Sequence, residues 1–170
     1  MAAAASRVDG PFRINYTTKA DSVRVAVADA VPYGIVMFHQ RAESPLLLNG
    51  FEASRRFFAD CLSETDPKRE HLWVAHVDHQ ARCIHLSRHD GDDGGAGLPL
   101  RQVIADAAAH GSAAVILAHN HTSGDPTPTA ADRQLTRRLA LAGEAIDLTV
   151  LDHIVIAGRQ CSSMRAMGLL

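Results

Sequence analysis

Two histidines and an aspartate lie near one another in the stretch 118–132, which reads AHNHTSGDPTPTAAD. His119 and His121 directly follow an apolar run, and residues two apart on an extended strand point the same way. Asp132 comes eleven residues after the second histidine, at the start of a predicted helix. Two imidazole nitrogens and one carboxylate oxygen would leave a tetrahedral zinc ion one open position for water. The spacing therefore predicts a zinc site that makes hydroxide available at neutral pH.

A hydrolytic zinc site also needs a group that moves protons, and glutamate is the usual choice. The chain contains five glutamates, at positions Glu43, Glu52, Glu64, Glu70 and Glu144. Glu70 alone immediately precedes a predicted buried strand, where a partly desolvated carboxylate can face the metal. We therefore predict Glu70 as the general base, although a lone glutamate before a strand is more often a solvated surface residue.

The pattern of apolar side chains predicts the elements that would position these residues. The short apolar run 112–118 indicates a strand buried on both faces, and it leads into the two histidines. Helical spacing predicts a helix over 129–143, with Asp132 in its first turn and Gly143 following the last apolar position. A second predicted helix, 98–111, places Gly111 as its C-terminal cap.

The rest of the chain indicates a layered α/β domain. Residues 71–78 and 82–88 have the pattern of a two-stranded hairpin, and residues 51–64 have the spacing of an amphipathic helix. Residues 147–158 indicate a strand pair or one bent strand, and residues 89–97, with four glycines and three aspartates, an acidic loop. The order helix, hairpin, helix, strand, helix, strand favours an α/β fold.

The first part of the chain has no comparable pattern. Residues 1–20 are small and polar. The apolar stretch 23–38 is interrupted by breaking residues, which favours short strands or an irregular arm. We therefore expect residues 1–45 to form an N-terminal extension that is partly flexible.

The motif resembles that of a known family. His119-x-His121, seven residues, Thr129, two residues and Asp132 are similar to the JAMM motif of JAB/MPN metallopeptidase domains, in which serine stands at the position of the threonine. The longer strings HNHTSGDPTPTAAD, LDHIVIAG and REHLWVAHVD resemble the RadC-like branch of that superfamily. The resemblance covers residues 46–170 and implies a RadC-like JAB/MPN metalloenzyme domain there. It implies an α/β, cytidine-deaminase-like JAB/MPN fold, with a mixed β-sheet packed by helices in a single domain.

The resemblance also implies a role for each motif position. His119, His121 and Asp132 would bind Zn²⁺, and Glu70 would act as the general base. Thr129 would use its hydroxyl to stabilise an oxyanion. The implied activity is that of a zinc-dependent JAMM-type hydrolase, a metallopeptidase or isopeptidase that acts on a peptide or isopeptide substrate.

The sequence departs from the family pattern at two places. Thr122 stands where the RadC-like pattern usually has proline, which implies a less rigid loop. Residues 89–97 differ most from the family's usual stretch, so the resemblance implies no role for them in substrate binding.

Three of the singled-out residues have a second interpretation. Thr129 and Asp132 also have the spacing of a helix N-cap with an acidic N3 residue, a capping box. One threonine hydroxyl can cap while the aspartate binds metal, so both interpretations stay open. His153 is either a core histidine satisfied by Asp152 or backbone, or a residue that orients the metal site through its ligands.

Composition and charge limit the classes of function. A net charge of −2 and a pI near 6.5 argue against a strongly basic nucleic-acid surface. Five arginines could still form local basic faces: Arg55, Arg56, Arg133, Arg137 and Arg138. The competing hypothesis is therefore a DNA-repair-associated DNA-binding or accessory protein that uses the MPN domain as an interaction module. A non-catalytic scaffold is a third, although such domains typically lack the ligands found in this chain.

Cysteine usage and hydropathy predict the compartment. The three cysteines are far apart in sequence and form no metal-binding or redox motif. No apolar run approaches the 18 or so residues of a membrane span. We therefore expect a cytoplasmic protein without a membrane segment.

Overall fold

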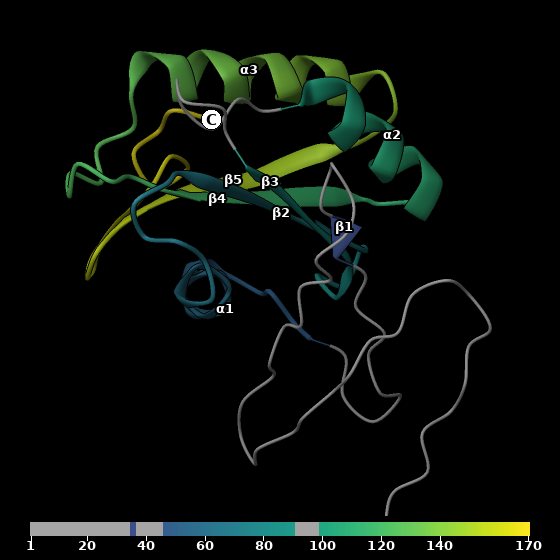
Figure 1. Ribbon diagram of the computed structural model, residues 1–170. Helices are drawn as coiled ribbons and strands as arrows, with labels where there is room; N and C mark the ends of the chain where they lie inside the picture. Colours follow the sequence, from purple (N-terminus) through teal and green to yellow (C-terminus); the bar gives the residue numbers. More distant parts are fainter. Residues whose placement is uncertain (1–34, 37–45, 91–98) are drawn as a thin grey trace, which may run out of the picture.

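The structure is a computed structural model, and it describes residues 35–36, 46–90 and 99–170 (Figure 1). The helices in these ranges are α1 (Phe51–Ser63), α2 (Leu100–His110) and α3 (Ala130–Glu144). The strands are β1 (Ile35–Val36), β2 (His71–Val77), β3 (Cys83–Asp90), β4 (Ala114–Asn120), β5 (Thr149–Ala157) and β6 (Gln160–Ser163). Most of the predicted N-terminal extension lies outside the described residues.

The strands form one mixed sheet in the order β1-β3-β2-β4-β5-β6. β4 and β5 run parallel, whereas the other neighbouring pairs of described strands are antiparallel. α1 covers one face of the sheet, and α2 and α3 lie along the other (Figure 1). The expected α/β architecture, a mixed sheet packed by helices, is confirmed.

Apolar side chains hold the helices against both faces of the sheet. Alternation along β4 sends Ile116 and Ala118 into the cluster beneath α1, and Val115 and Leu117 into the cluster beneath α2 and α3. All four are buried, as expected for a central strand covered on both sides. His119 continues the second series, so the strand turns its imidazole toward α3.

Two glycines near helix ends have different functions. Gly111 ends α2 with a left-handed backbone (φ 61°), as predicted, because it has no Cβ to oppose that conformation. Gly143, which we expected to end the helix predicted over 129–143, lies inside α3, because this helix continues to Glu144. A Cβ at Gly143 would lie 2.6 Å from the carbonyl oxygen of Leu148. The position therefore needs glycine for close packing of the chain that returns to β5.

The predicted strands form, with corrections at their ends. β2 and β3 make the predicted hairpin, but β3 continues to Asp90 and so includes the first two residues of the predicted 89–97 loop. The remaining loop residues lie outside the described part of the chain. Residues 147–158 contain one strand, β5, and the short strand β6 that follows was not predicted. Within 23–38, Ile35–Val36 forms β1 against β3.

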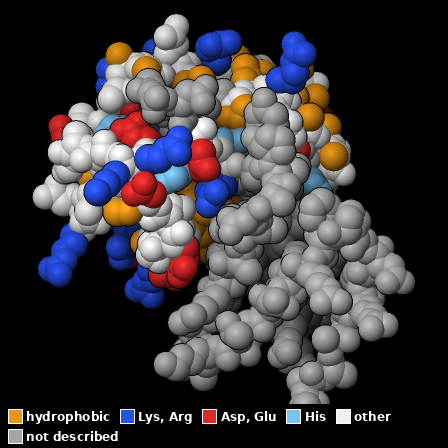
Figure 2. Space-filling model, viewed as in Figure 1, with side chains coloured by type: hydrophobic (Ala, Val, Ile, Leu, Met, Phe, Trp, Pro, Cys, Tyr) orange, Lys and Arg blue, Asp and Glu red, His pale blue; other side chains and the backbone are white. Residues whose placement is uncertain are grey.

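The described surface mixes acidic and basic side chains. On the face shown in Figure 2, basic and acidic groups are interspersed rather than gathered by sign. Arg55 pairs with Glu52 at 3.0 Å, and Arg133 donates to a backbone carbonyl before α3, whereas Arg137 and Arg138 are exposed. DNA binding by these arginines stays a prediction. Among the described helices, none has the length and apolar character needed to cross a membrane.

Candidate metal centre

His119, His121 and Asp132 meet where β4 ends and α3 begins. The Nε2 atoms of His119 and His121 are 2.9 Å apart. Asp132 Oδ1 lies 3.4 Å from His119 Nε2, and Asp132 Oδ2 lies 3.4 Å from His121 Nε2. The ligand atoms of a tetrahedral zinc ion, with bonds of about 2.0–2.1 Å, are separated by about 3.3–3.4 Å. The two histidine–aspartate separations match this spacing, and the two histidine nitrogens are about 0.4 Å closer together than a bound zinc ion would hold them.

A chain of hydrogen bonds determines which nitrogen of His119 carries the proton. Thr136 Oγ1 donates to the Asp132 carbonyl oxygen at 2.6 Å, so it accepts from Nδ1 of His153 at 2.7 Å. Burial, with the neighbouring His119, lowers the pKa of His153 to about 3, so its ring is neutral. Its Nε2 therefore accepts from His119 Nδ1 at 2.8 Å. A neutral His119 then presents the lone pair of Nε2 to the cluster.

A single hydrogen bond likewise places the proton of His121 on its Nδ1. Its Nδ1 lies 2.7 Å from the backbone carbonyl oxygen of Asp125, which can only accept, so Nδ1 carries the proton. With the proton on Nδ1 in both rings, the Nε2 atoms of His119 and His121 present lone pairs that face each other at 2.9 Å. A shared proton or a bound cation is needed to relieve that contact. With a carboxylate beside both nitrogens, the donor set fits zinc.

Asp132 is held in its carboxylate form by the start of α3. The backbone N–H and the hydroxyl of Thr129 donate to Asp132 Oδ2, at 2.7 and 2.6 Å, and the Asp132 N–H donates to Thr129 Oγ1 at 3.1 Å. Burial raises the pKa of Asp132, but the adjacent His119 ring and the hydrogen bonds from Thr129 outweigh burial and lower it. The predicted capping box is therefore present together with the predicted ligand cluster.

Glu70 lies half-buried immediately before β2. The side chain of Asn120, which lies between His119 and His121 in the sequence, forms hydrogen bonds with the two residues on either side of Glu70. The Asn120 Oδ1 accepts from the His71 N–H at 2.7 Å, and its Nδ2 donates to the Arg69 carbonyl oxygen at 2.8 Å. Because β2 and β4 are antiparallel neighbours, this places the backbone of Glu70 at the same edge as the histidines. The role of Glu70 as general base stays a prediction.

The structure adds positioning residues that the sequence did not identify. Asn120 ties the end of β4 to the two residues that flank Glu70, and Thr136 ties α3 to His153 of β5. The sequence could have indicated Thr136, since it follows Asp132 by four residues and so lies on the same face of the helix. His153 contacts His119 through its ring, whereas Asp152 accepts only its backbone N–H, at 2.7 Å. Of the two interpretations of His153, the one that orients the site matches the contacts.

Known proteins match most of the described domain. A family model described as RadC-like JAB domain matches residues 48–169. The UPF0758 proteins YfjY and YkfG of Escherichia coli strain K12 are 38% and 39% identical over 104 residues, which is 61% of this chain and 65% and 66% of those proteins. UPF0758 protein STH371 of Symbiobacterium thermophilum is 51% identical over 70 residues, 41% of this chain and 30% of that protein. The chain thus spans less than two thirds of these relatives, and their three names state no activity.

Proposed function

Because the chain belongs to the RadC-like JAB family, we propose that it is a zinc-dependent hydrolase of the JAMM type, acting on amide or isopeptide bonds. The observation that supports this most is the contact between the Nε2 lone pairs of His119 and His121 beside Asp132. Zinc bound by these three residues would polarise a carbonyl and lower the pKa of a water to about 7. The side chains of His121 and Asp132 are 7% and 18% exposed, so the centre is partly accessible to solvent.

The chain's own residues would orient the centre and move the protons. Glu70 takes a proton from the attacking water and passes it to the departing amine, while the carbonyl carbon gains the water oxygen and loses the nitrogen. The hydroxyl of Thr129 donates to the oxyanion that forms on the substrate. Since that hydroxyl has a single proton, which points at Asp132 in the free protein, it must turn toward the substrate first. His153 keeps the His119 ring in its ligand orientation.

A metal analysis with a matched variant tests this function. The full chain, purified without an affinity tag, is compared with His119→Ala for zinc content and for cleavage of a panel of peptides and isopeptides, followed by mass spectrometry. We expect the wild type to hold about one more zinc per chain than the variant and to be the only one of the two that cleaves. His79→Ala, which removes an exposed histidine of the β2–β3 turn, is the control that should retain both properties.

The outcomes separate the three hypotheses. Equal zinc content in the wild type and His119→Ala would place the metal elsewhere and contradict the proposal. Zinc binding without cleavage of any member of the panel would favour a non-catalytic scaffold. Retention on DNA that is lost between roughly 50 and 200 mM salt, in the absence of cleavage, would favour the DNA-associated alternative.

A further inference from the structure

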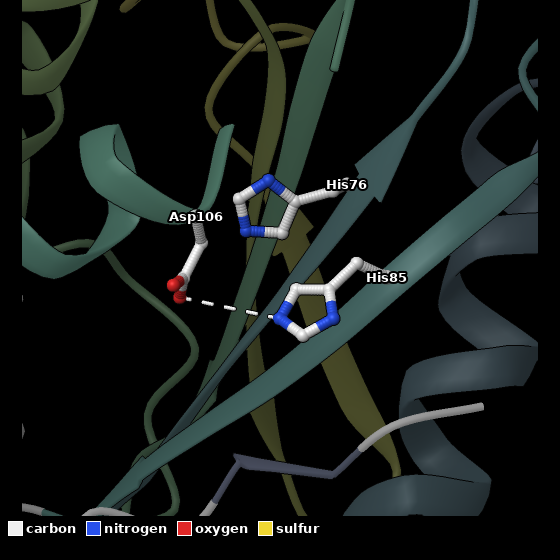
Figure 3. Close-up of side chains that lie close together, drawn as sticks. All are labelled: His76, His85 and Asp106. Carbon is white, nitrogen blue, oxygen red and sulfur yellow. Dashed lines mark ion pairs between the residues drawn. The ribbon is translucent and has the colours of Figure 1, made fainter. Parts of the chain in front are cut away.

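A second group of two histidines and an aspartate lies between the sheet and α2. His76 of β2 is paired with His85 of β3, and Asp106 of α2 points toward both rings (Figure 3). His76 is fully buried, and His85 and Asp106 are 3% and 8% exposed. These three residues, called the interior cluster below, belong to no part of the site at the end of β4.

Each side chain of the interior cluster has a buried polar atom without a hydrogen-bond partner among the described residues. These atoms are His76 Nε2, His85 Nε2 and Asp106 Oδ2. Buried polar atoms are nearly always paired in native proteins, so three orphans in one place call for an explanation. His85 Nε2 and Asp106 Oδ2 are 4.0 Å apart, which is too long for a hydrogen bond. A single atom between the side chains would pair all three.

The opposite ends of the same side chains are held in place. Ser112 Oγ lies 3.1 Å from His76 Nδ1, and Gln102 Nε2 donates to Asp106 Oδ1 at 2.7 Å. The ring of His85 is stacked on that of His110, with centroids 4.0 Å apart and 15° between the planes. Hydrogen bonds like those to His76 and Asp106 orient the ligands of metal sites and leave the other nitrogen or oxygen for the ion, whereas the ring of His85 is held by stacking alone. The arrangement therefore presents one donor atom from each residue to the centre.

We propose that His76, His85 and Asp106 bind a second metal ion, of the zinc class, which links β2, β3 and α2. Each residue offers a ligand atom within 4.8 Å of those of the other two. Reaching the spacing of about 3.3–3.4 Å in a zinc tetrahedron requires small rotations of the Asp106 and His85 side chains. Two nitrogen donors favour zinc over calcium or magnesium, which prefer oxygen.

The electrostatics of the interior cluster agree with this assignment. Burial lowers the pKa of His76 to about 3, with a further contribution from His85. Burial and the nearby His110 also lower the pKa of His85. Both rings are therefore neutral at neutral pH, the form that binds a metal ion. Because all three residues are nearly inaccessible to solvent, the ion would stabilise the fold rather than meet a substrate.

Zinc binding by a chain that lacks the first site tests the proposal directly. In the full-length variant His119→Ala/His121→Ala, we expect about one zinc per chain to remain, and added zinc to raise the midpoint of thermal unfolding. Asp106→Asn is then added to this variant, because it preserves the side-chain volume. It should lower the zinc affinity at least about tenfold, which is the loss typical of changes to residues that only support a ligand. His79→Gln on the same background is the matched control and should bind zinc with unchanged affinity.

The reverse experiment keeps the proposal testable if the double variant folds poorly. Asp106→Asn in the otherwise wild-type chain should lower the zinc content by about one per chain without altering any peptide cleavage. A folded His119→Ala/His121→Ala variant, judged by circular dichroism, that binds no zinc would overturn the proposal. Unchanged zinc affinity after Asp106→Asn would overturn it as well. Neither result depends on whether the first site hydrolyses anything.

Discussion

The same set of side chains, two histidines and one aspartate, forms two clusters on one face of the sheet. The edge cluster, His119, His121 and Asp132, lies where β4 ends, and the interior cluster lies beneath α2. Leu72, the β-sheet partner of His119, and His76 are four residues apart on β2, which corresponds to about 13 Å along the strand. Apolar residues of the α2–α3 side fill the space between the two clusters.

The clusters differ in how their donor atoms are satisfied. In the edge cluster the donor atoms are 2.9–3.4 Å apart, and the Nδ1 atom of each histidine is held by a hydrogen bond. In the interior cluster the donors are farther apart and have no partner among the described residues. A centre with one accessible side can exchange water and substrate, whereas a closed one can only contribute stability. The two clusters share their residue types, so only burial and the spacing of the donor atoms distinguish them.

The largest expected difference between the clusters concerns catalysis. Glu70→Gln should lower peptide cleavage by about 100- to 10,000-fold, because the amide cannot take up a proton, and zinc content should not change. Cleavage rates and zinc content of the same preparation give both quantities. Glu64→Gln, an exposed glutamate after α1, is the control with wild-type activity. Full activity of Glu70→Gln would show that the edge cluster does not use this residue.

A smaller loss of zinc affinity should follow from changes to the residues that orient each cluster. His153→Gln removes the ring that orients His119, and Gln102→Met removes the donor that orients Asp106. We expect His153→Gln to lower the zinc affinity of the edge cluster by about 10- to 100-fold. Gln102→Met should lower the affinity of the interior cluster by a similar factor and leave that of the edge cluster unchanged. Titrations against a competing chelator, on backgrounds that retain one cluster each, measure the two affinities. If either change weakened both affinities equally, the clusters would not be independent.

The smallest effect concerns the helix cap that supports only the edge cluster. Thr129→Ala removes the hydroxyl that caps α3 and holds Asp132, so it should lower the free energy of unfolding by about 1 kcal/mol. Thr129→Ser keeps the hydroxyl and should restore most of that stability, as measured by denaturant unfolding. Thr122→Ala, in the same loop, is the control. Equal stability of the alanine and serine variants would mean that the cap contributes nothing measurable.

Sequence reasoning identified the edge cluster because its members are close along the chain. A strand period of two aligns His119 with His121, and a short turn returns Asp132 to them, so local geometry was sufficient. The same locality explains why the capping box and Gly111 were predictable. Gly143 was misread because the contact that requires glycine comes from Leu148, after the chain has turned back against α3.

Periodicity and turn chemistry act over a few residues, so they predicted the motif and most of the elements, although not β6 or the ends of β3 and α3. The interior cluster could not be predicted in this way, because its members come from β2, β3 and α2. The pairing of His76 with His85 depends on a register irregularity between His76 and Val77, and Asp106 joins them only when α2 packs on the sheet. Packing of distant elements, which no local pattern encodes, likewise placed His153 against His119.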